Sequence, residues 1–300
     1  MTLRRTVAPI TRAVKLWSEA DGLRMSAAMS FYGILSLAPL LLVLVAVLGW
    51  WLDREMLETG LVSQIGAVVG EQGGKLIEEA LKSAKEPVES ITATIVGLVV
   101  LAFGATGVFG ELQDSFQAVW SHGRETPARR SWWRTATLRL RGVAYILVFG
   151  FLLLVSLALS TLLTMFSGWA SQGFAMEVLL RAINEGIGFA FGGALFYGLM
   201  RLSGGPKPRH RYLLVGAFVA AILFTIGRQV LTIYLSSAAV VSAYGAAGSL
   251  IVLLMWIYFS SAVLLFGAGC ARALEDARND APASEPAPDA KPAGAKAGLT

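Results

Sequence analysis

The chain has 300 residues, of which 55% are hydrophobic and only 15% are charged, and its mean hydropathy is +0.63. Soluble domains carry roughly a quarter charged residues, so this composition excludes an ordinary soluble enzyme and leaves no stretch for a separate soluble catalytic domain. A single cysteine, Cys270, excludes a disulfide framework and a multi-cysteine metal site. We therefore predict an all-α integral membrane protein.

The N-terminal part of the chain predicts one membrane span with a surface segment on each side. Residues 1–26 are basic, and the helical spacing of their apolar residues predicts a short interfacial helix in a cytoplasmic segment. The uncharged run at 27–52 is long enough to cross a bilayer core of ~30 Å. Residues 53–90 are predicted to form two amphipathic periplasmic helices, separated near Gly73 and Gly74.

Five further apolar runs follow, so we predict a bundle of six transmembrane helices. The second to sixth spans are expected at about 91–110, 142–166, 178–200, 212–235 and 246–268. With their connections, the six spans form one membrane domain over 27–275. The tail at 276–300 is rich in Ala, Pro, Asp and Lys, a composition that predicts disorder.

The basic residues predict the orientation of the chain. An even number of spans places both termini on one side of the membrane. The N-terminal segment, the connections 111–141 and 201–211 and the C-terminal end hold nineteen Lys and Arg residues, whereas 53–90 on the opposite side holds four. The positive-inside rule therefore places both termini in the cytoplasm.

Two apolar runs resemble a known family. They are AAMSFYGILSLAPLLL, from Ala27 to Leu42, and YGAAGSLIVLLMWIYFSSAVLLFGA, from Tyr244 to Ala268. In these runs the chain resembles the YihY/BrkB family of bacterial inner-membrane proteins, once labelled ribonuclease BN, and the resemblance extends over roughly 15–275. It implies a six-span inner-membrane protein with proposed links to envelope integrity, serum resistance or lipid export, and with no established reaction.

The chain departs from this family at two positions of the last span. Family members commonly carry a glutamine and a glutamate where this chain has Ala262 and Gly269. Positions seven residues apart lie on one face of a helix. If that polar pair serves a proton or ion step in relatives, this chain lacks the step or supplies it elsewhere.

Two charged residues lie inside the predicted spans. Glu185 and Arg228 are each about seven or eight residues from the outer end of their span, so both lie ~10–12 Å below the periplasmic boundary. A short connection makes their helices antiparallel neighbours, and an ion pair is expected. Charged residues inside a membrane are costly and commonly mark a functional site. We therefore predict a substrate-binding site at this pair. The polar residues expected beside the pair are Asn184, Gln229 and Thr225.

The same two charges have structural interpretations. The pair can act only as a clamp between helices, or Glu185 can pair with Arg181 one turn away on its own helix. Small residues on the spans predict close helix packing, with a pathway lined by glycine backbone as the alternative. The glycines predicted to pack are Gly104, Gly107, Gly192, Gly193, Gly245 and Gly248.

The connection at 111–141 combines arginines with Trp132 and Trp133. Aromatic residues among basic ones are typical of single-strand nucleic-acid binding, but contact with anionic lipid headgroups explains the pattern on a membrane protein. We therefore expect lipid contact and no nucleic acid. The arginines predicted to contact headgroups are Arg129, Arg130, Arg134, Arg139 and Arg141.

Enzyme signals are weak throughout the sequence. The run GEQGGKL at 70–76 lacks the first glycine and the Ser/Thr of a P-loop, and no catalytic or metal-ligating cluster is found. We expect no catalytic residue, metal or cofactor. The function predicted is transport or translocation of a lipid-like or amphipathic envelope substrate. The expected partners are anionic membrane lipids and a second copy of the chain. The alternatives are a non-transporting membrane scaffold or envelope-integrity factor and, last, a membrane-associated ribonuclease.

Overall fold

The computed structural model of the chain describes residues 2–48, 58–63, 66, 71–83, 91–121, 174–204, 206–237 and 248–279. Over these residues the chain is helical and contains no strand, which confirms the all-α prediction for this part. The helices are α1 (Thr2–Glu19), α2 (Gly22–Leu48), α4 (Glu71–Ser83), α5 (Ile91–Trp120), α7 (Phe174–Leu202), α8 (His210–Ser237) and α10 (Gly248–Asn279).

Five of the predicted spans fall on α2, α5, α7, α8 and α10, whereas the third, 142–166, lies outside the described residues. Two described segments are long and apolar enough to cross a membrane by length and composition, namely His210–Leu231 and Gly248–Asn279. α5 and α10 extend about ten residues beyond the spans expected for them, so 111–120 and 276–279 are helical rather than part of a loop and a tail.

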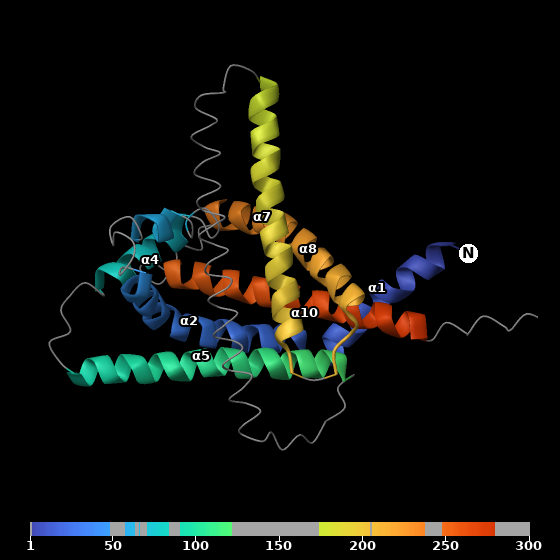
Figure 1. Cartoon of the computed structure of the whole chain (residues 1–300), viewed down its shortest axis with the longest axis horizontal. Helices are drawn as coiled ribbons and strands as arrows, with labels where there is room; N and C mark the ends of the chain where they lie inside the picture. Colours follow the sequence, from blue (N-terminus) through green and yellow to red (C-terminus); the bar gives the residue numbers. More distant parts are fainter. Residues whose placement is uncertain are drawn as a thin grey trace, which may run out of the picture.

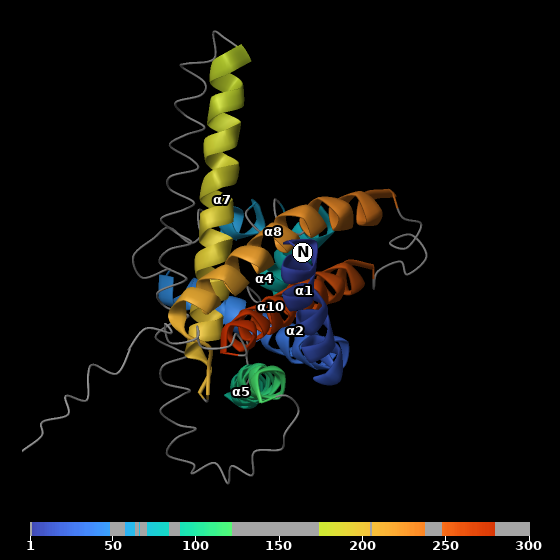
Figure 2. The same cartoon turned by 90° about the vertical axis from the view of Figure 1, so that its right-hand side faces the viewer.

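The helices pack around α10. α2 packs against both α5 and α10, α8 packs against α10 and α7, and α1 packs against the C-terminal part of α10 (Figure 1). α7 extends steeply away from the other helices in both views (Figures 1 and 2), with α8 as its main neighbour among the described helices. α7 therefore does not run parallel to α5 and α10, as a helix of a simple upright bundle would.

The N-terminal helix is separated from the first long helix by a tight turn. Asp21 has a positive φ of 52°, a conformation that ends α1 and lets α2 begin at Gly22. The indole of Trp17 lies against Gly22, where a Cβ would overlap it. Because α1 leaves this turn in a new direction, its buried face packs on α10 while Ile10 and Val14 remain exposed.

The short helix α4 also packs on the long helices. Ile77 and Leu81 form a buried cluster with Leu37 of α2. α4 begins at Glu71, two residues before the boundary predicted near Gly73 and Gly74, and both glycines are buried inside α4. The physical reason is close packing, because a Cβ on Gly74 would lie 3.3 Å from the Cα of Gly66. On the exposed face, Lys82 Nζ lies 2.6 Å from Glu78 Oε1 and lowers the pKa of that carboxyl.

The largest core lies where α5, α7 and α10 end and α8 begins. Phe116 and Trp120 of α5 stack with ring centroids 5.0 Å apart, and the Trp120 indole donates a hydrogen bond of 3.2 Å to the carbonyl of Ala268. Other buried members of this core are Val119, Phe196, Met200, Leu213, Ala217, Leu264, Leu265, Ala268 and Ala271. Because the core joins the ends of these four helices and, through Met29, also α2, it fixes them relative to one another.

Several of the predicted packing glycines lie at helix crossings. A Cβ on Gly104 would lie 2.8 Å from the Cβ of Ser36, and Gly107 lies against the Tyr32 ring, so α5 packs on α2 through both glycines. Gly248 is buried at the start of α10. These contacts fit the general use of small residues for close helix approach.

Two other predicted glycines on α7 contribute little to packing. A Cβ on Gly193 would make only ordinary contact, at 3.8 Å, with Ala221 of α8. Among the described residues, a Cβ on Gly192 would meet nothing within 4 Å, so no packing contact of Gly192 is found there. The face of α7 that contacts α8 runs through Phe189, Gly193 and Phe196, and Gly192 lies at its edge. Gly245 lies outside the described residues.

Candidate functional site

The charges of α7 and α8 meet, as their equal depth predicts. Arg228 Nη2 donates to both carboxylate oxygens of Glu185, at 3.0 Å to Oε2 and 3.4 Å to Oε1. The Arg228 side chain is 26% exposed and the Glu185 side chain is 59% exposed. The guanidinium is therefore the more enclosed partner, and the carboxylate faces outward.

The apolar side chains Ile226, Val230 and Ile233 of α8 are each more than half exposed, on other faces of the helix than Arg228. One turn from Glu185, Phe189 of α7 meets Phe218 of α8 edge to face, with ring centroids 5.6 Å apart. The aromatic contact holds the two helices together, so the ion pair is positioned by helix packing as well as by its own charges.

The other predicted members of the site are less engaged. Thr225 Oγ1 donates to the carbonyl of Ala221 at 2.8 Å, so its hydroxyl donor is used within its own helix. Gln229 is exposed on the outer face of α8. The side chains of Asn184 and Arg181 lie outside the described residues, as do Arg129, Arg130, Arg134, Arg139 and Arg141.

The arrangement favours recognition of charge over bond chemistry. An arginine presents several donors in a fixed fork and binds carboxylates and phosphates through two parallel hydrogen bonds. An anionic group that approaches from the exposed side can compete with Glu185 for Arg228. Among the described residues, no group of three or more His, Cys, Asp or Glu side chains is arranged to hold a metal ion.

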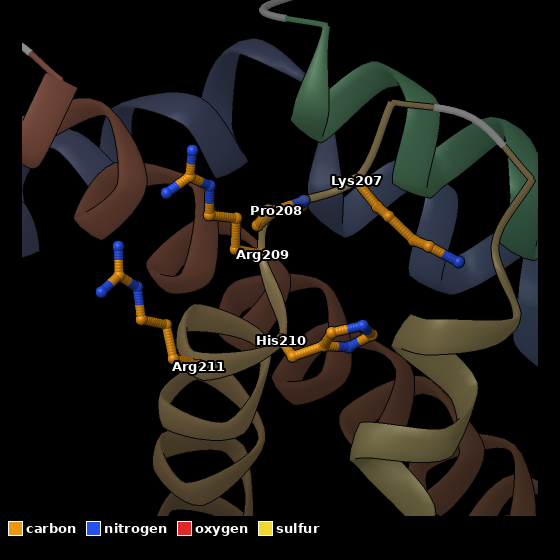
Figure 3. Close-up of a pocket in the computed structure, with 5 residues that line it drawn as sticks. All are labelled: Lys207, Pro208, Arg209, His210 and Arg211. Atoms are coloured by element: carbon orange, nitrogen blue, oxygen red, sulfur yellow. The ribbon is translucent and has the colours of Figure 1, made fainter.

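The second polar feature is the basic connection at 201–211, which the sequence alone shows only as one of several basic loops. The turn between α7 and α8 forms an open pocket of about 530 Å³ that is lined by Lys207, Pro208, Arg209, His210 and Arg211 (Figure 3). Beside it, Arg201 Nη1 donates to Tyr197 Oη at 3.0 Å. The sequence signal was the run of basic residues directly before the start of a long helix.

The two positions that depart from the resembled family lie in different environments. Gly269 is buried where α1 crosses α10, and a Cβ there would lie 3.2 Å from the carbonyl oxygen of Ala13. Ala262 is half-buried on the same face of α10, two turns before Gly269. The close approach of α1 therefore gives a physical reason for a glycine at 269 in this chain.

Comparison with known proteins agrees with the apolar helical structure. The family described as virulence factor BrkB matches residues 13–292. The inner membrane protein YhjD of Escherichia coli is 25% identical over 276 residues, which cover 87% of this chain and 79% of that protein. An uncharacterized protein of Dickeya dadantii is 26% identical over 95% of this chain and 88% of its own length.

A UPF0761 membrane protein of Histophilus somni is 24% identical over 70% of this chain and 69% of its own length. No solved structure matches the chain. The family match covers most of the chain and confirms the resemblance found in its two apolar runs. The chain therefore belongs to the BrkB family and is a membrane protein of the BrkB/UPF0761 type.

Proposed function

We propose that this chain binds an anionic, amphipathic envelope lipid in the inner membrane and moves it between leaflets, with Arg228 as the residue that binds its charged group. The ion pair of Arg228 with Glu185 in the apolar part of α7 and α8 carries this proposal. Glu185 is the counter-ion that keeps Arg228 compensated when no lipid is bound.

The energetics of the pair support a binding role over a purely structural one. A charged residue at the centre of a membrane helix costs about 2.5–3.5 kcal/mol on insertion scales, and such residues commonly mark a functional pathway. A clamp between helices is most effective when both charges are enclosed, yet the Glu185 carboxylate is 59% exposed. The exposed side is where an anionic headgroup can exchange with Glu185.

The inner-membrane location and orientation belong to the same proposal. α1 and the C-terminal part of α10 lie at the same end of the described structure, joined by an ion pair between Arg12 and Asp276. The basic turn between α7 and α8 contacts this end through Glu275 of α10. The positive-inside rule places this end in the cytoplasm, and the relative from Escherichia coli is named an inner membrane protein.

The test is mass spectrometry of the lipids that co-purify with the wild-type chain, Arg228→Ala and Glu185→Gln. The proposal expects an anionic lipid enriched with the wild type, lost in Arg228→Ala, and retained or increased in Glu185→Gln, which removes the competing anion. Membrane insertion of each variant, measured by extraction and size-exclusion profile, must be unchanged.

A charge exchange separates the structural clamp from the binding site. The double variant Glu185→Arg with Arg228→Glu keeps an ion pair between α7 and α8 but moves the cation to the other helix. If the variant has wild-type stability without lipid enrichment, Arg228 acts by binding. Unselective lipid profiles in the wild type and in Arg228→Ala alike would refute the proposal and favour a non-transporting scaffold.

A further inference from the structure

The turn between α7 and α8 is held rigid from three directions. Gln117 Nε2 of α5 donates to the carbonyl of Gly204 at 3.3 Å, and the backbone N–H of Arg209 donates to Glu275 Oε1 of α10 at 3.0 Å. Lys207 Nζ donates to the carbonyl of Arg201 at the end of α7, at 2.9 Å, and Pro208 is fully buried. These contacts therefore fix the backbone of the turn relative to α5, α7 and α10.

This turn presents two exposed arginines, Arg209 and Arg211. Figure 3 shows both side chains pointing to one side of the turn, with Lys207 and His210 pointing to the other. Neither guanidinium forms an ion pair with any acidic side chain of the described residues; Arg211 Cζ lies 4.9 Å from the centre of the Tyr212 ring.

The nearest acidic side chains are already engaged. Glu275 Oε2 accepts a hydrogen bond from Arg272 at 3.3 Å, and Asp276 pairs with both Arg12 and Arg272, at 3.1 Å and 3.2 Å. In addition, Arg209 and Arg211 lie at the N-terminus of the long helix α8, where the helix dipole makes further positive charge unfavourable. An anion between the two guanidinium groups relieves both effects.

An exposed apolar track begins directly beyond the arginines. Leu214, Val215, Phe218 and Ile222 are exposed and follow Arg211 at three, four, seven and eleven residues, so they share its face of α8. A ligand with a phosphate and a hydrocarbon chain matches this order of a cationic end followed by an apolar surface. A free phosphate would contact only the cationic end.

We propose that Arg209 and Arg211 bind the phosphate of an anionic glycerophospholipid whose acyl chain lies along Leu214, Val215, Phe218 and Ile222. The site does not depend on the transport proposal, because Arg211 and Arg228 are separated by ~25 Å along α8. Two guanidinium groups bind one phosphate through charge-assisted hydrogen bonds, and this geometry discriminates against a zwitterionic lipid, whose phosphate is already compensated.

The experiment reconstitutes the full chain in nanodiscs that contain phosphatidylcholine with a minor fraction of phosphatidylglycerol, and counts the lipids retained by native mass spectrometry. The test variant is Arg209→Gln with Arg211→Gln. The matched control is Arg24→Gln with Arg278→Gln, which removes two exposed arginines from the same end of the molecule without touching the pocket. The wild type and the control should retain phosphatidylglycerol preferentially.

The test variant should lose this preference about tenfold, the effect expected from the loss of at least one charge-assisted hydrogen bond. Equal loss in the test and control variants would overturn the proposal, because it would show general attraction of charge. Displacement of phosphatidylglycerol by millimolar inorganic phosphate would also overturn it, in favour of a soluble phosphate site. No preference in the wild type would refute it outright.

Discussion

Arg12 of the first helix and Asp276 of the last form an ion pair across almost the whole length of the chain. Arg12 Nη2 lies 3.1 Å from Asp276 Oδ2, and the aspartate side chain is only 9% exposed. Asp276 also pairs with Arg272 on its own helix, at 3.2 Å. One buried carboxylate therefore compensates two arginines and holds α1 on α10, beside the packed residues Ala13 and Ala273.

The first prediction concerns this carboxylate. Asp276→Asn should lower the free energy of unfolding by about 2 kcal/mol, because the charge-assisted hydrogen bond from Arg12 and the ion pair with Arg272 are weakened and two arginines are left facing each other. α1 should also be released, so trypsin should cleave after Arg12 or Lys15 faster than in the wild type. Tryptophan fluorescence during heating in detergent, together with limited proteolysis, measures both effects.

Arg12→Gln should be milder than Asp276→Asn, because Asp276 keeps its contact with Arg272. Arg278→Gln is the matched control, since Arg278 is exposed two residues further along the same helix. Unchanged proteolysis of α1 in Asp276→Asn would show that apolar packing alone holds the helix.

The second prediction concerns the crossing of α8 and α10. A Cβ on Gly216 would overlap the carbonyl oxygen of Gly267, and a Cβ on Gly267 would lie 2.7 Å from the carbonyl oxygen of Gly216. Because backbone atoms cannot move aside as a flexible side chain does, Gly216→Ala should destabilise the protein by about 1–3 kcal/mol, the usual cost of overpacking. Thermal unfolding in detergent measures this.

Gly192→Ala is the control for that substitution. A Cβ at this position meets nothing within 4 Å, and alanine is the better helix former by about 1 kcal/mol. Gly192→Ala should therefore be neutral or stabilising. Equal destabilisation by both substitutions would indicate that α7 has a neighbour at Gly192 and would contradict its outward course.

The Glu185–Arg228 contact was predictable because it depends on two local quantities. The position of a residue along an apolar run gives its depth, and a short connection makes two runs neighbours. Helix type was predictable for the same reason, since the apolar runs have the length of a membrane helix. The contact of Glu185 with Arg228 could therefore be predicted without knowing how any other segment packs.

The contact of Arg12 with Asp276 could not be predicted in this way. It joins positions 264 residues apart, and the sequence does not show which face of α10 receives α1. The same limit applies to Gly192 and Gly74, since a glycine pattern indicates that close packing can occur and not where a partner lies. The turn at Arg209 depends on contacts from α5 and α10 that are 87 and 66 residues away in the sequence.

The third prediction concerns Gly269, where the resembled family commonly carries a glutamate. Because a Cβ at 269 would lie 3.2 Å from the Ala13 carbonyl oxygen, a larger side chain must push α1 away from α10. Gly269→Glu would also place a carboxylate against that carbonyl, in a position where no water reaches it, which is costly. The variant should release α1 to trypsin while leaving the core around Trp120 folded.

The control is Ala262→Gln, the other position that departs from the family. Ala262 is half-buried and lies two turns before the contact of Gly269 with Ala13, so glutamine there should leave the proteolysis of α1 unchanged. Combining Gly269→Glu with Asp276→Asn should add little further release, because both variants break the same contact between α1 and α10. If Gly269→Glu left α1 as protected as in the wild type, the helices would have to separate enough to hold the side chain, and the close approach at Ala13 would be wrong.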